Sequence, residues 1–303
     1  MPPPPRGIRD TPPGTQDRIR RMESNPHAPS SIEGRIGIVI PVYNTGPLAL
    51  GAARSARVAL GSAENVIVVD DGSNDSDTLA VLDSLREEGF RVIRQPNGGV
   101  SSARNTGIQQ LATPYVIALD SDDEVTPEAP RAMGEILDRH NDVAIVTGGA
   151  FEVINGAEYL SPPPDGPVTR NAMREATLLA MASMFRRSDW KAVGGFPEGL
   201  SMGEDWVFWM RLLRTGGTVE ILGAPIARRH LGEHQVTRGY IDPRQTARAA
   251  ALVRSENSDL YAGQEIELIE RLNEAEMQLA AYRHTYRHID RFKSRIRRGL
   301  GRC

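Results

Sequence analysis

The sequence predicts an α/β fold in which a mostly parallel sheet is flanked by helices. Between Ile36 and about residue 150, short apolar runs alternate with helical segments, a pattern typical of parallel strands joined by helices. Two of the runs end in acidic residues, one at Asp70-Asp71 and the other in the segment Asp120 to Asp123. Because an open α/β sheet binds its ligands at the carboxyl ends of its strands, these acids mark the expected functional edge.

The elements of the first half follow in a regular order. We expect strands at 36–42, 65–70, 91–94, 115–120 and 143–148, separated by helices near 47–60, 76–88, 100–112 and 127–139. Pro41 should end the first strand, because proline cannot donate to a sheet ladder. Thr126 and Pro127 suit the N-cap and first position of the last of these helices.

The second half has a mixed pattern. We expect a proline-rich loop at 162–167, helices near 171–184 and 204–215, and a short strand at 218–222. From about residue 241 the character changes to a long helix, which we expect to extend from the globular domain.

Length and composition fit one domain with appendages, since 303 residues exceed one typical domain but fall short of two large ones. Residues 1–34 contain eight prolines and almost no apolar periodicity, so we expect them to be disordered. Residues 35–240 form the domain, with a division between its halves after residue 150. Residues 241–303 form the helical extension.

The end of this extension combines an apolar stripe with a basic face. The stripe follows helical spacing, at Leu272, Ala275, Leu279, Tyr282, Tyr286, Ile289, Phe292, Ile296 and Leu300. The basic residues are Arg283, Arg287, Arg291, Lys293, Arg295, Arg297, Arg298 and Arg302, although the whole chain has a net charge of -3. The stripe predicts packing on the domain or in a homodimer, and the basic face predicts contact with anionic lipid. We see no nucleic-acid recognition motif and expect no nucleic acid partner.

Several features favour a cytoplasmic location. Cys303 is the single cysteine and permits no intrachain disulfide, and no apolar run approaches the length that crosses a bilayer. The N-terminus lacks the basic and apolar regions of a secretory signal. We therefore expect a cytoplasmic protein, with peripheral contact at the inner face of the membrane if the basic helix binds lipid.

Two acidic clusters carry candidate chemistry. Asp120 and Asp122 follow a buried strand and offer oxygen ligands to Mg²⁺ or Mn²⁺, although acids there also suit the start of a helix. Glu204 and Asp205 begin an amphipathic helix, where acids stabilise the positive helix end. Either of this pair could also serve as a general base that accepts a proton from a hydroxyl nucleophile.

Six segments, in this order, resemble the inverting glycosyltransferases of family 2, whose nucleotide-binding fold is called GT-A. They read PVYN, VVDDGS, NGGVSSARNTGI, LDSDD, FRRSDWKAVGGF and GEDWVFWMRL, and the resemblance covers roughly Arg35 to Tyr240. It implies transfer of a sugar from a nucleoside-diphosphate sugar, with a UDP-sugar as the expected donor. The implied acceptor is a hydroxyl on a glycan, a lipid-linked molecule or a small molecule, in cell-envelope polysaccharide biosynthesis.

The resemblance also implies the roles of the acidic residues. Mn²⁺ or Mg²⁺ would bind Asp122, with Asp120 beside it. Asp205 would be the general base, because it stands six residues before Arg211 as the base does in members with this motif. His230 stands where many members carry a histidine that closes over the diphosphate or joins the metal, and a metal role would favour Mn²⁺.

Nucleotide recognition is implied for residues 35–150, and acceptor binding for residues 151–240. The expected nucleotide-sugar-binding set is Pro41, Tyr43, Asp71, Arg104 and Asp120. In the family the aspartate matching Asp71 accepts a hydrogen bond from the base, the ring matching Tyr43 lies against it, and the arginine matching Arg104 contacts base or phosphate. These residue types suit those contacts, although Tyr43 could also be a core residue.

The remaining expectations concern neighbours of this set and other functions. Asp70 should order its loop through backbone amides, and Glu204 and Trp206 belong to the acceptor side. A nucleotidyltransferase would need a basic glycine-rich loop after the first strand, which PVYNTGPLAL lacks. A phosphatase would place its DxD after the first strand, whereas here it comes about 80 residues into the fold. A non-enzymatic scaffold would have no reason to keep both metal ligands and a base.

Overall fold

The computed structural model of the chain describes residues 31–231 and 243–263, and single helical positions between 266 and 281. Its strands are β1 Ile36–Val42, β2 Val66–Asp70, β3 Arg91–Arg94, β4 Tyr115–Ala118, β5 Asp123–Val125, β6 Val143–Ile154, β7 Ala157–Ser161, β8 Met184–Arg186 and β9 Thr218–His230. Its helices are η1 Glu33–Arg35, α2 Leu48–Leu60, α3 Ser76–Glu87, α4 Val100–Gln109, α5 Ala129–Arg139, α6 Arg187–Ala192, α7 Glu204–Arg214, α9 Pro243–Glu256 and η2 Ser258–Leu260.

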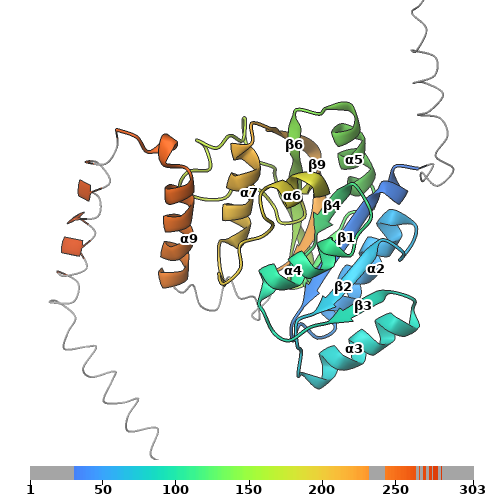
Figure 1. Cartoon of the computed structure of the whole chain (residues 1–303). Helices are drawn as coiled ribbons and strands as arrows, with labels where there is room; N and C mark the ends of the chain where they lie inside the picture. Colours follow the sequence, from blue (N-terminus) through green and yellow to red (C-terminus); the bar gives the residue numbers. More distant parts are fainter. Residues whose placement is uncertain are drawn as a thin grey trace, which may run out of the picture.

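The strands form one mixed sheet with helices against it (Figure 1). Their order is β3-β2-β1-β4-β8-β6-β9-β5, and β7 pairs with β6 outside this path. The pairs among β3, β2, β1 and β4 are all parallel, as predicted for the first half. The carboxyl ends of β1, β2 and β4 therefore lie at one edge. In the second half β8 is antiparallel to both β4 and β6, while β6 and β9 run parallel.

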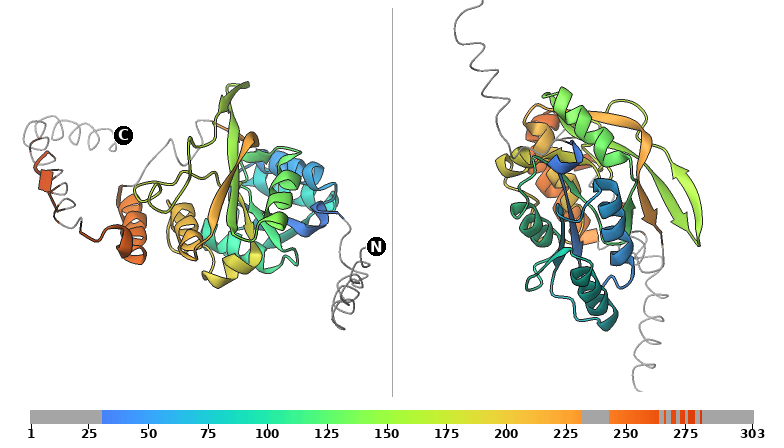
Figure 2. Two further views of the ribbon diagram at one scale, coloured as in Figure 1. Left: turned by 90° about the horizontal axis from the view of Figure 1, so that it is seen from above. Right: turned by 90° about the vertical axis from the view of Figure 1, so that its right-hand side faces the viewer.

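Both faces of the parallel part are buried. On β1, Ile36, Ile38 and Ile40 enter one core with the alanine-rich face of α2, while Val39 enters a second core with α4 and α7. This explains the nearly continuous apolar runs, which are typical of parallel strands covered on two sides. By contrast, β7 is mostly exposed and projects with the end of β6 as a hairpin (Figure 2).

Pro41 does not end β1, contrary to the prediction. It stands opposite Val69 of β2, and the strand continues to Val42. On the other side of β1 the amide of Leu119 donates to the carbonyl of Val39, at 2.9 Å, where β4 is ending. Residue 41 faces this same side, so its missing N–H falls beyond the β1–β4 ladder and costs no hydrogen bond there.

The predicted helix near 171–184 is wrong. Turns occupy most of this segment, and β8 begins at Met184. Arg170 and Glu175 instead form ion pairs with Asp259 and Arg254, so tertiary contacts override a helical sequence pattern.

The remaining differences concern boundaries. The helix α5 has Glu128, not Thr126, as its N-cap residue, and the Thr126 hydroxyl donates to the carbonyl of Pro225 at 2.8 Å. The strand β6 runs through the expected division after residue 150, and β9 extends to His230. Glu33–Arg35 form a 3-10 turn inside the segment predicted to be disordered.

Within the described part of the chain, no helix is both long enough and apolar enough to cross a membrane. All the residues named for the stripe and the basic face of the C-terminal extension lie outside the described residues. Both interpretations of that extension stay predictions.

Candidate active site

Arg104 joins two acidic clusters that are far apart in the sequence. Its Nη2 donates to Oδ1 of Asp120 at 2.6 Å, and its Nη1 donates to Oε1 of Glu204 at 2.8 Å. Arg104 lies on α4, Asp120 follows β4, and Glu204 begins α7. The structure therefore brings the acidic loop after β4 and the carboxylate pair of α7 to the same place.

The charged side chain of Arg104 is deeply buried. The residue is 2% exposed, and its guanidinium lies 5.3 Å from the ring centroid of Phe196. Its Nε is buried and has no hydrogen-bond partner. Burial disfavours the charged form, but the two carboxylates outweigh it and raise the pKa of Arg104 above its ordinary value. A permanent cation thus sits between the two acidic clusters.

The two carboxylates of α7 have different environments. Gly203 precedes them in the left-handed conformation, with φ of 74°, and starts the helix. The ion pair that Arg104 forms with this helix is with Glu204 and not with Asp205. Burial, and then the charge of Glu204, raise the pKa of Asp205 to about 6, against the opposing effect of Arg104. Such a carboxylate is suited to accept a proton near neutral pH.

The acidic loop after β4 is strongly negative. Burial, followed by the charges of Asp120 and Asp122, raises the pKa of Asp123 to about 8, although Arg229 opposes the shift. The loop is fixed by Ser121, whose hydroxyl lies 2.7 Å from that of Thr45 after β1. Ser121 therefore ties the acidic loop to the turn after β1.

The donor set suits a hard divalent ion that binds together with a nucleotide. No three His, Cys, Asp or Glu side chains converge as a preformed metal site in the part of the chain that the structure describes. Mg²⁺ is usually held by one or two carboxylates plus substrate phosphates, so Asp120 and Asp122 fit such an ion.

His230 ends β9 beside this loop. The strands β5 and β9 pair so that Arg229 stands opposite Asp123, and Nε2 of His230 lies 3.2 Å from Oε1 of Glu124. Carboxylates often orient histidines in this way. The structure thus brings His230 next to the acidic loop. A second histidine, His234, which the sequence offers as an alternative to His230, lies outside the described residues.

Asp70, which ends β2, and Asp71, which follows it, both organise loops. Asp70 accepts from the amide of Ser73 at 2.8 Å and from Arg94 at 2.7 Å, as its expected loop-ordering role requires. Asp71 accepts from the amides of Gly98 and Gly99 and from the side chain of Gln95, each at 2.8 Å. Asp71 therefore holds the start of α4 in place at the proposed base-binding edge.

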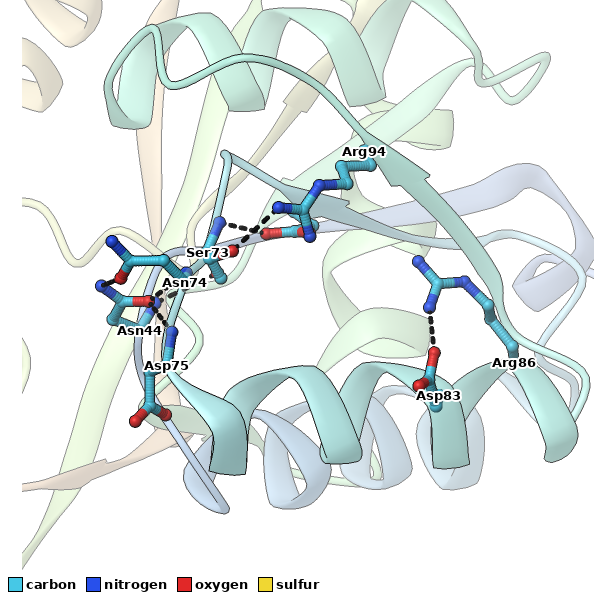
Figure 3. A network of polar contacts seen from close by, with 8 residues as sticks. Asn44, Ser73, Asn74, Asp75, Asp83, Arg86 and Arg94 are labelled. Carbon is cyan, nitrogen blue, oxygen red and sulfur yellow. Dashed lines mark hydrogen bonds and ion pairs between the residues drawn. The ribbon is translucent and has the colours of Figure 1, made fainter.

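Sequence reasoning missed the residue that shapes the turn after β1. Asn44 adopts φ of 51°, and its Oδ1 accepts from the amides of Asn74 and Asp75 (Figure 3). Its own amide donates to the hydroxyl of Ser73 at 3.2 Å. The left-handed preference of asparagine was a usable signal. The role of Gln95, by contrast, has no local sequence signal.

The other predicted positions differ in exposure. Tyr43 is 50% exposed, so it is not the core residue of the alternative interpretation, whereas Pro41 is buried in β1. Trp206 is only 6% exposed, and its indole N–H donates to the carbonyl of Met173 at 2.6 Å. Trp206 thus holds the turn at Met173 from within the core.

The structure is thus an α/β protein in which a buried arginine joins a strand-end acidic loop to a helix-start carboxylate pair. Residues 37–187 match the sequence profile of the family described as "Glycosyl transferase family 2". The chain belongs to glycosyltransferase family 2.

Curated relatives have related names but are longer. Chondroitin synthase from Escherichia coli is 27% identical over 184 residues, covering 60% of this chain and 27% of that protein. Succinoglycan biosynthesis protein ExoO from Rhizobium meliloti is 28% identical over 221 residues, covering 67% of this chain and 62% of ExoO. In four other relatives, the part that matches this chain is only 21–31% of the relative's length.

The fold is also found among solved structures. A fragment of S. aureus TarS, solved in complex with UDP-GlcNAc, matches with a TM-score of 0.61. The match has 22% identity and covers 73% of this chain and 66% of the other. At this identity the likeness shows the fold alone.

Proposed function

We propose that this chain is an inverting glycosyltransferase that uses a nucleoside-diphosphate sugar as donor, with Asp205 as the general base. The observation that carries the proposal is the Asp120–Arg104–Glu204 contact, which joins the acidic loop of the nucleotide-binding half to the carboxylate pair of α7. The contact supports the proposal because the acidic loop and the carboxylate pair lie on opposite sides of one buried arginine.

The proposed donor is a UDP-sugar. TarS, whose fold this chain shares, has been solved with UDP and with UDP-GlcNAc. At this edge of the sheet, Tyr43 offers an exposed ring against which a nucleotide base could lie. Asp71 and the loop of Gln95 offer polar groups beside it. The names of chondroitin synthase and ExoO support a glycan acceptor in polysaccharide synthesis.

The proposed reaction is a single displacement. The acceptor hydroxyl oxygen forms a bond to the anomeric carbon while the bond from that carbon to the diphosphate breaks, and Asp205 accepts the hydroxyl proton. Because one base acts and no glycosyl-enzyme forms, the anomeric configuration inverts. Glu204 is already engaged by Arg104, which favours Asp205 over Glu204 as the base.

The diphosphate leaves with negative charge, which Asp120 and Asp122 cannot stabilise by themselves. A divalent ion held by these two carboxylates would neutralise that charge when bound with the nucleotide. The role of the two side chains is to fix the ion at the sheet edge, with His230 and Glu124 beside them.

The test is incubation with a panel of nucleotide sugars, with and without Mn²⁺, while nucleoside diphosphate release is measured. We expect release from a UDP-sugar that depends on the ion. Calorimetry should show that Asp122→Ala loses UDP-dependent Mn²⁺ binding, while Asp83→Ala on the exposed face of α3 retains it. Unchanged metal and UDP affinity in Asp122→Ala would remove the site assignment.

A further inference from the structure

The segment formed by α9 and η2, with Tyr261 after it, lies beyond the residues that match the family profile. It comes after residues 232–242, which the structure does not describe, and stands beside α7 (Figure 1). We call residues 243–261 the α9–η2 segment. Its inner side chains Ala249 and Val253 are buried in the same core as α7. It is therefore part of the folded domain.

Glu256 of the α9–η2 segment forms polar contacts with α7. The Glu256 carboxylate forms a bidentate ion pair with Arg211, with distances of 2.8 Å to Nε and 2.7 Å to Nη2. The backbone carbonyl of Glu256 accepts from Arg214 at 2.8 Å. One residue of α9 thus anchors two arginines of the helix that carries the proposed base.

The same segment also contacts the start of α7. A Cβ atom added to Gly203 would lie 2.7 Å from the Cβ of Ala249, closer than such atoms approach. Gly203 immediately precedes Glu204 and Asp205. The path of the chain into the carboxylate pair is therefore limited on one side by α9.

A third set of contacts reaches the turns before β8. Arg170 donates to both carboxylate oxygens of Asp259 at 2.7 Å, and the Tyr261 hydroxyl donates to the carbonyl of Arg174 at 2.6 Å. Between these positions, the carbonyl of Met173 accepts from the indole of Trp206, the residue after Asp205. The α9–η2 segment, the turns and the first turn of α7 thus form one connected group.

We propose that the α9–η2 segment positions the proposed base, and that Glu256 is its principal positioning residue. The proposal rests on the proposed function for its catalytic consequence. In its physical form it states that Asp205 keeps its place because α9 holds both the helix behind it and the turns beside it. The Glu256–Arg211 pair is partly buried, with 23% and 20% of the side chains exposed, so solvent screens it less than a surface pair.

The experiment uses the full chain with Glu256→Ala, Arg211→Ala and the charge-reversed double variant Arg211→Glu with Glu256→Arg. Glu256→Gln preserves the side-chain shape if the alanine variant folds poorly. Glu135→Gln is the matched control, because Glu135 pairs with two arginines on the exposed side of α5. Three quantities are measured: amide hydrogen exchange, UDP-GlcNAc affinity with Mn²⁺, and the rate of UDP release to water at saturating donor.

We expect exchange at residues 169–177 and 203–206 to become about tenfold faster in Glu256→Ala or Glu256→Gln, while exchange in β1, β2 and β4 stays unchanged. The rate of UDP release should fall about 10- to 100-fold, because a displaced base loses its alignment, and donor affinity should stay within about twofold. The charge-reversed pair should recover most of the rate, and Glu135→Gln should match the wild type.

Unchanged exchange at residues 203–206 would overturn the proposal, as would a loss of donor affinity parallel to the loss of rate. A wild-type chain that releases no nucleoside diphosphate from any nucleotide sugar of the panel would overturn the proposed function instead. In that case the exchange result still decides whether α9 positions the start of α7.

Discussion

The two halves of the domain hold their site residues in different ways. Around β2, Asp70 and Asp71 bind loops that lie within 3 to 28 residues of them in the chain. On the acceptor side, the contact between Arg211 and Glu256 spans 45 residues, and that between Arg104 and Glu204 spans 100. The proposed nucleotide-binding edge around Asp70 and Asp71 thus depends on contacts at shorter sequence separation, whereas the position of the proposed base depends on residues from the whole domain.

The largest expected effect separates the two halves directly. Asp205→Asn keeps the side-chain shape but removes the proton-accepting charge, so the transfer rate should fall about 10²- to 10⁴-fold. Because the nucleotide-binding edge is built independently, UDP affinity measured by calorimetry should stay at the wild-type value. Near-normal turnover would assign the base to Glu204 or another residue.

The second prediction breaks the link between the halves. Arg104→Met leaves Asp120 and Glu204 without their shared cation, and removing one partner of a buried ion pair costs about 3–5 kcal/mol. Urea unfolding should show this loss in the free energy of unfolding. Arg131→Met, which removes an exposed pair on α5, should cost no more than about 1 kcal/mol. Equal effects of the two substitutions would contradict the central role of Arg104.

The third prediction concerns the nucleotide-binding edge alone. Asp71→Ala removes the acceptor of two backbone amides and one side-chain amide, so the free energy of unfolding should fall by about 1–3 kcal/mol. UDP affinity should fall with it, while hydrogen exchange in α7 stays unchanged. If exchange in α7 rises as much as in α4, the halves are not independent in the way described.

The smallest expected effect is a dependence of rate on pH. Burial and the charge of Glu204 raise the pKa of Asp205 to about 6, and only the ionised carboxylate can accept a proton. UDP release at saturating donor should therefore be about tenfold slower at pH 5 than at pH 7. The melting temperature over the same range serves as the control for folding. A rate that is flat between pH 5 and 7 would argue against Asp205.

The sequence predicted the nucleotide-binding half well because its signals are local. Apolar runs, glycine turns and strand-end acids each occupy a few consecutive residues, and the structure confirms β1, β2, β3 and β4 with α2, α3 and α4 between them. The left-handed Asn44 could also have been found in this way. The contacts of Gln95 could not, because an amide side chain in a loop has many possible partners.

The acceptor half was predicted less well because its structure depends on distant partners. The segment 171–184 has a helical pattern, yet Arg170 and Glu175 pair with the α9–η2 segment and the chain forms turns. Trp206 was predicted to belong to the acceptor side, and its ring is buried. The Arg104–Glu204 contact spans 100 residues and carries no spacing signal that one sequence could reveal.

Pro41 stands where β1 and β4 part, directly before the acidic loop. In a parallel ladder that ends with Leu119 N–H donating to Val39, the next rung would run from the N–H of residue 41 to the carbonyl of Leu119. Proline has no backbone N–H to donate. No hydrogen bond therefore forms at this position, and the chain can turn away from β1 at Asp120. The missing hydrogen of one residue in β1 thus coincides with the place where the two strands part, just before the acidic loop begins.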